Sequence, residues 1–93
     1  MTFRKAIDEK ARWRALQRRV AALPRDYRVV YQEIQRYLLT VAPTLATGEM
    51  PVLVDLADLF AQGAQDQRPV LDLTGTDVAA FADALIANAP SDA

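Results

Sequence analysis

Trp13 and three tyrosines are the side chains whose type and spacing best suit a binding site. Tyr27, Tyr31 and Tyr37 fall within a stretch of eleven residues. Aromatic rings can line a pocket for a small ligand, and phenol hydroxyls can orient it. The same rings could instead fill the core, where each hydroxyl needs a partner such as a backbone carbonyl or a carboxylate. Two interpretations follow: a ligand pocket between the first two helices, lined by Trp13 and the tyrosines, or a core packed against the first helix around Trp13.

The sequence has few residues that could act in catalysis. Histidine and cysteine are absent, and the single serine is Ser91. No glycine-rich phosphate-binding motif is present. Asp55 and Asp58, three residues apart, could in principle ligate Mg²⁺ or Ca²⁺, but their helical phase favours a solvated face. The sequence therefore predicts that the protein is not an enzyme and has no metal site and no cofactor.

Charge is divided between the two halves of the chain. Residues 1–40 hold 10 basic and 4 acidic side chains, a net of +6, whereas residues 41–93 hold 1 and 8, a net of −7. Such asymmetry can indicate nucleic-acid binding. The first helix, however, has no aromatic residue on its basic face and no helix-turn-helix signature after it. The favoured interpretation is that the basic half pairs with the acidic half, within the chain or on a second copy.

Apolar residues outside the main helical stripes suggest a protein-binding surface. Phe3 and Ile7 are four residues apart on the flank of the first helix away from Trp13, beside arginines. Single exposed apolar residues are ordinary on a protein surface, and this is one interpretation of the pair. The other is the edge of a protein interface, where an apolar pair bordered by arginines is typical. Val29 and Leu39 also lie off the stripe of the second helix. The predicted partner-binding residues are Phe3, Arg4, Ile7, Arg14 and Arg18.

The elements that position these residues are helices. The sequence of 93 residues has room for one domain, and its apolar residues recur at helical spacing. This pattern predicts an all-α, compact four-helix bundle-like domain built on an antiparallel hairpin of the first two helices. The periodicity also puts the tyrosines on the apolar face of the second helix, which favours the core interpretation. The expected helices span about residues 2–22, 25–41, 51–63 and 75–89, and residues 90–93 should fray.

The connections carry turn and cap signals. Pro24 ends the first helix and suits the first turn of the second. Gly63 fits the left-handed position after the third helix. Residues 70–73 could form a short extended piece, and Thr74 with Asp77 has the spacing of a capping box, with Thr76 as the alternative cap.

Membrane insertion and export are not predicted. No segment approaches 18 consecutive apolar residues, and the first ten residues lack the apolar run of a signal peptide. A cytoplasmic location is the resulting expectation.

Three segments together resemble a known family. They are Trp13 to Leu38, which contains Leu23-Pro24 and the three tyrosines; Leu56-x-x-Leu59-Phe60-x-x-Gly63-Ala64; and Val70-Leu71-Asp72-x-Thr74-Gly75-x-Asp77-Val78-Ala79-x-Phe81-x-Asp83. Their order and spacing, over about residues 10–86, are similar to the bacterial domain of unknown function 1048 family. The resemblance implies a small, soluble, all-helical protein, often encoded beside a PadR-like winged-helix transcription regulator. It supplies no catalytic or ligand-binding residues.

The sequence leads to one hypothesis about function and two alternatives. The hypothesis is a non-enzymatic helical interaction or regulatory module, an accessory partner of a PadR-like regulator. The alternatives are a nucleic-acid-binding protein that uses the basic face of the first helix, and a small-ligand sensor with the aromatic pocket described above. Homo-oligomers are compatible with the divided charge.

Overall fold

The computed structural model describes residues 2–46 and 50–89, and the side chains of residues 7–44 and 50–89 within them. The predicted all-α class is confirmed: this part of the chain holds helices and no strand. Residues 90–93, expected to fray, lie outside the described residues. The elements are α1 (Thr2–Ala21), α2 (Arg25–Val41), the 3₁₀ helix η1 (Pro43–Ala46), α3 (Pro51–Gln65), α4 (Val70–Thr74) and α5 (Val78–Ala87).

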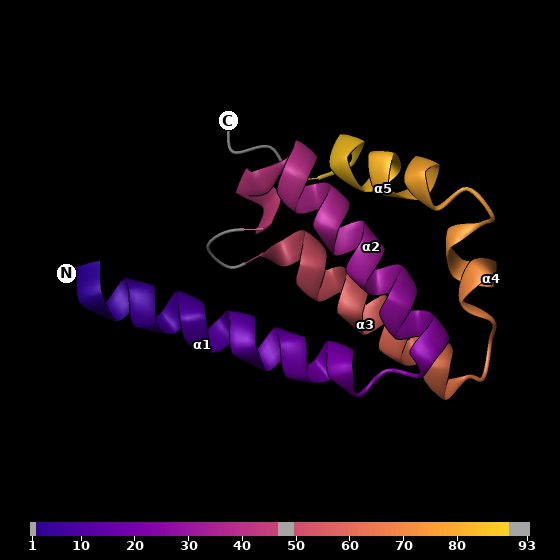
Figure 1. Cartoon of the computed structure of the whole chain (residues 1–93), viewed down its shortest axis with the longest axis horizontal. Coiled ribbons are helices and arrows are strands. Elements are labelled where there is room, and N and C mark those ends of the chain that lie inside the picture. The colour runs from indigo at the N-terminus through magenta and orange to yellow at the C-terminus, as the bar shows by residue number, and fades with distance from the viewer. Residues whose placement is uncertain (1, 47–49, 90–93) are drawn as a thin grey trace.

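Helix α2 is the centre of the fold. One side of α2 buries Tyr27, Tyr31, Ile34 and Leu38, the stripe that the sequence periodicity predicts. Helix α2 contacts α3, α5 and η1 and crosses the middle of the molecule, with α1 on one side and α5 on the other (Figure 1). Burial of this stripe against α3 supplies most of the core.

Helix α1 is joined to the core only along its second half. Leu16 and Val20 are buried, as is Leu23 in the turn that follows. Further towards the N-terminus, the face of α1 that carries Leu16 and Val20 holds Arg12 and Glu9, so the helix has no large apolar side chain to bury there. The chain then reverses at Leu23-Pro24 as predicted, but α1 and α2 diverge away from this turn (Figure 1). The first half of α1 consequently stands apart from the core.

The end of α3 differs from the expectation. Gly63 does not follow the helix; it is buried within α3, which continues to Gln65. Gln67 takes the left-handed conformation instead, with φ at 59°. The amides of Gln67 and Arg68 donate to the carbonyls of Ala64 and Gly63, which is the Schellman pattern of a helix end. Gly63 is small for a packing reason: a Cβ there would lie 2.7 Å from the Tyr27 hydroxyl.

The segment before α5 also differs. Residues 70–73, expected as an extended piece, form the short helix α4, which runs to Thr74. Gly75, with φ at 78°, then ends α4 in a conformation that favours glycine. The predicted Thr74 capping box and the start at residue 75 are therefore wrong, because Asp77 itself caps α5 by accepting a hydrogen bond from the Ala80 amide at 3.0 Å.

Candidate functional site

The first two tyrosines of α2 are core residues. Tyr27 and Tyr31 are buried, and both pack edge-on against Phe60 of α3, with ring centroids 5.5 and 5.9 Å away. The core interpretation therefore describes these rings, but their aromatic neighbour is Phe60 rather than Trp13. Trp13 is half-buried at the edge of the same core.

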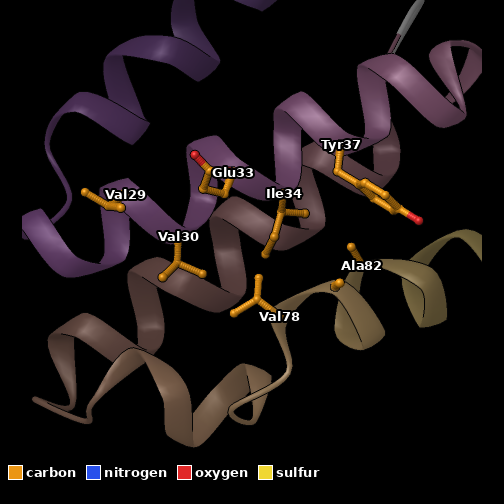
Figure 2. A pocket seen from close by; sticks show the side chains of 8 residues that line it. Val29, Val30, Glu33, Ile34, Tyr37, Val78 and Ala82 are labelled. Carbon is orange, nitrogen blue, oxygen red and sulfur yellow. The ribbon is translucent and has the colours of Figure 1, made fainter.

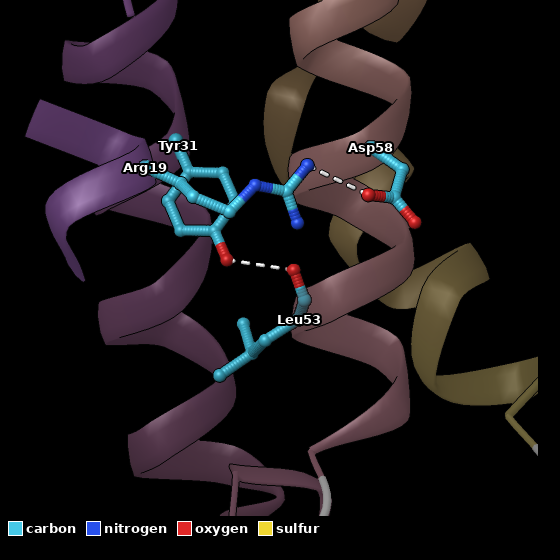
Figure 3. Close-up of polar contacts among 4 residues, drawn as sticks. All are labelled: Arg19, Tyr31, Leu53 and Asp58. Carbon is cyan, nitrogen blue, oxygen red and sulfur yellow. Dashed lines mark hydrogen bonds and ion pairs between the residues drawn. The ribbon is translucent and has the colours of Figure 1, made fainter. Parts of the chain in front are cut away.

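The three tyrosine hydroxyls point to three different parts of the fold. Tyr27 donates to the Arg68 carbonyl at 2.7 Å. Tyr31 donates to the Leu53 carbonyl, also at 2.7 Å (Figure 3). Tyr37 donates to the Asp83 carboxylate on α5. Burial raises the pKa of the Tyr31 hydroxyl well above its usual value, and the nearby charge of Arg19 offsets this only in part. These partners are the backbone carbonyls and carboxylates that the core interpretation requires.

The aromatic residues do not line one shared pocket. Tyr31 is fully buried, and Tyr27 borders a corner between the start of α2 and the turn after α3. Tyr37 lines a groove on the opposite side of α2 from α1, and Trp13 lies on α1. Tyr27 and Tyr31 thus share Phe60 in the core, whereas Tyr37 lines a groove beside α5, so the geometry does not gather the tyrosines at one pocket between the first two helices.

An apolar groove lies between α2 and α5. Its volume is about 280 Å³, near the lower end of the size of small-molecule sites. Figure 2 shows Ile34 and Val78 across its floor, Tyr37 at one end and Glu33 on its rim. The lining residues are Val29, Val30, Glu33, Ile34, Tyr37, Val78, Ala79 and Ala82. The groove is not predicted by the sequence pattern, although the position of Val29 off the apolar stripe of α2 is a signal for it.

Helix α5 is lightly packed. Only Ala82 is fully buried on it, and the larger apolar side chains of α5 are half-buried. A second groove of about 330 Å³ runs along its other flank, where Leu59 of α3 remains 45% exposed. The helix therefore presents apolar surface on both sides.

The basic face of α1 is largely free of intrachain ion pairs. Arg19 contacts Asp58 of α3 at 2.7 Å, and this is the one ion pair within the described residues (Figure 3). It joins the basic part of the chain to the acidic part. Arg14 and Arg18, which were predicted to bind a partner, are exposed, and Ile7 is 61% exposed. The side chains of Phe3 and Arg4, the other two residues of that prediction, lie outside the described part.

Metal and membrane features are absent from the described residues. No group of three acidic side chains there could hold a metal ion, and Asp55 and Asp58 are exposed. None of the described helices combines the length and apolar character needed to span a bilayer.

These features define a small all-α domain with exposed apolar and basic surfaces and no recognisable catalytic group in its described part. Residues 4–91 match the family model described as "Protein of unknown function (DUF1048)", so the chain belongs to the DUF1048 family. A structural comparison finds a DUF1048 protein from Bacillus cereus ATCC 10987 with a left-handed superhelix fold, solved by crystallography at 2.05 Å resolution. The two share 45% identity, with a TM-score of 0.72 over 78% of this chain and 90% of that one. A search of curated proteins finds no match.

Proposed function

We propose that this protein is a non-enzymatic helical interaction module that docks through the outward face of α1. The observation that carries the proposal is the first half of α1, which stands off the core and exposes Ile7 among basic side chains. Lys10, Arg14 and Arg18 follow Ile7 by three, seven and eleven residues, so all four lie on one face. An apolar side chain within an arginine-rich surface suits the edge of a protein interface.

The partner in this proposal is a protein with an acidic docking surface, and the function is regulatory. A PadR-like transcription regulator encoded nearby is the first partner to test, because the family resemblance suggests that gene arrangement. In this proposal the protein acts in the bacterial cytoplasm. Nucleic acid is the second candidate because the same arginines could neutralise phosphates. Ile7 favours protein, since an exposed apolar side chain on this face gains nothing from a phosphate backbone.

Isothermal titration calorimetry against the PadR-like regulator tests this proposal. The variant Arg14→Glu/Arg18→Glu should weaken binding at least tenfold, because it reverses two charges at the interface. The control Arg25→Glu/Arg36→Glu reverses two exposed charges on α2 and should change affinity less than threefold. Absence of binding by the unmodified protein, or equal loss in both variants, would refute the proposed site. Salt-sensitive gel retardation of DNA by the unmodified protein would favour the nucleic-acid alternative.

A further inference from the structure

We propose that the α2–α5 groove binds the first half of α1 from a second copy of this chain, and that two copies exchange these contacts reciprocally. The proposal rests on the proposed function, because it uses the same outward face of α1. It adds the identity of one partner and the surface that receives the helix. We name the first half of α1, residues 2–12, the arm.

The groove has the length and chemistry of a site for a short helix. Val29, Glu33 and Tyr37 follow each other at four-residue spacing along one wall, which spans about 12 Å, or roughly two helical turns. The lining is apolar apart from Glu33 and the hydroxyl end of Tyr37. Two large apolar side chains one turn apart on an incoming helix would fill such a groove.

The arm offers such a pair of side chains. Ile7 is the most exposed of the large apolar residues that the structure describes, and Phe3 precedes it by four residues in the sequence. One turn of helix separates residues at this spacing. Burying a side chain of this size removes an unfavourable apolar contact with water.

Charge complementarity favours a second copy as the occupant. Glu33 lies on the groove rim, and Asp83 accepts a hydrogen bond from Tyr37, which lines the groove. Asp77 directly precedes the lining residue Val78 at the start of α5. Lys10 and Arg14 lie on the face of α1 that carries Ile7, and both are exposed. These carboxylates at the groove and the basic side chains on the Ile7 face of α1 can attract each other between two copies.

The fold prevents the arm from reaching its own groove. Helices α2 and α3 lie between the arm and α5, which occupy opposite sides of the molecule (Figure 1). The contact must therefore be made between chains. A pair of copies closed by a two-fold axis contains it twice, and closure of this kind is the commonest form of self-association.

Sedimentation velocity over a concentration series tests the proposal with paired variants. The unmodified 10.3 kDa chain should shift to a dimer as concentration rises. Ile7→Asp and Val29→Asp should each raise the dimer Kd at least tenfold, since each puts a carboxylate into the apolar contact. The controls Val41→Asp and Leu59→Asp alter side chains of similar exposure, 53% and 45%, outside the arm and groove and should change Kd less than threefold.

Mixing the two disabling variants gives the decisive result. Ile7→Asp retains an intact groove and Val29→Asp an intact arm, so an equimolar mixture should form a heterodimer with one of the two contacts. A misfolded variant could not restore association in this way. Recovery of dimer in the mixture supports the proposal. A monomer at every concentration, oligomers that grow beyond the dimer, no recovery on mixing, or equal loss in the controls would each overturn it.

The same variants separate this proposal from the proposed function. If the chain stays monomeric but Arg14→Glu/Arg18→Glu loses regulator binding, the interaction module stands and the dimer fails. If the chain dimerises as described but binds no regulator, the dimer stands and the choice of regulator fails.

Discussion

Replacing Gly63 with alanine should destabilise this protein, although the same change stabilises most helices. Gly63 lies inside α3, where alanine has the higher helix propensity by about 1 kcal/mol. A Cβ at this position would lie 2.7 Å from the Tyr27 hydroxyl and 2.8 Å from a Leu73 methyl carbon. Atoms this close must move apart, so both the Tyr27 ring and the Leu73 side chain have to shift.

The expected cost can be worked from these contacts. Overpacking a well-filled core costs about 1–3 kcal/mol. Displacing Tyr27 also weakens its 2.7 Å hydrogen bond to the Arg68 carbonyl, which contributes about 0.5–1.5 kcal/mol. After the favourable propensity is subtracted, Gly63→Ala should lower the free energy of unfolding by about 2 kcal/mol. For a domain of this size that corresponds to a fall in Tm of roughly 8–16 °C.

Urea denaturation of a double-mutant cycle measures this effect. Tyr27→Phe removes the hydroxyl that meets the new Cβ, so Gly63→Ala should cost about 1 kcal/mol less in the Tyr27→Phe background. Ala61→Gly, at an exposed position of the same helix, gives the propensity term without the clash. An alanine variant at position 63 that gains stability, or an equal cost in both backgrounds, would show that the close approach does not constrain the fold.

Three further perturbations test other contacts. Burial raises the pKa of the Tyr31 hydroxyl, so the folded form resists an ionisation that the unfolded chain undergoes near pH 10. The free energy of unfolding should therefore fall as pH rises above about 10. In urea titrations, Tyr31→Phe should flatten that pH dependence. Arg19→Ala breaks an ion pair with Asp58 whose side chains are 44% and 60% exposed, so it should cost under about 1 kcal/mol in thermal unfolding, and added salt should shrink the difference. Tyr37→Phe removes the hydrogen bond to Asp83 and should speed amide hydrogen exchange in α5 relative to α3. Unchanged exchange in α5 would mean that this hydrogen bond does not stabilise the helix.

The helices and the buried stripe were predictable because, in α2, the residues that recur at helical spacing are also the residues that the fold buries. Tyr27, Tyr31, Ile34 and Leu38 recur at helical spacing, and all four are buried. The position of Gly63 could not be predicted in the same way. A glycine near a helix end suits the left-handed residue as well as a close contact, and only the tertiary approach of Tyr27 decides between the two. Similarly, the spacing of Thr74 and Asp77 predicted one helix start, whereas Gly75 ends α4 and α5 begins only after Asp77.

The candidate surfaces depend on a tertiary feature that periodicity does not encode, the placement of α5. Val29 lies off the stripe of α2 by sequence, yet it borders an apolar groove because α5 packs beside α2 through Ala82 and leaves room on both flanks. A short helix with one fully buried residue cannot cover the apolar walls next to it. The arm of α1 lacks apolar side chains on the face that would pack on the core, because Glu9 lies on that face, whereas Ile7 faces outward. An uncovered apolar groove bordered by Glu33 and an uncovered basic helix face, held apart within one chain, are the physical reason to expect that this protein acts by binding other chains.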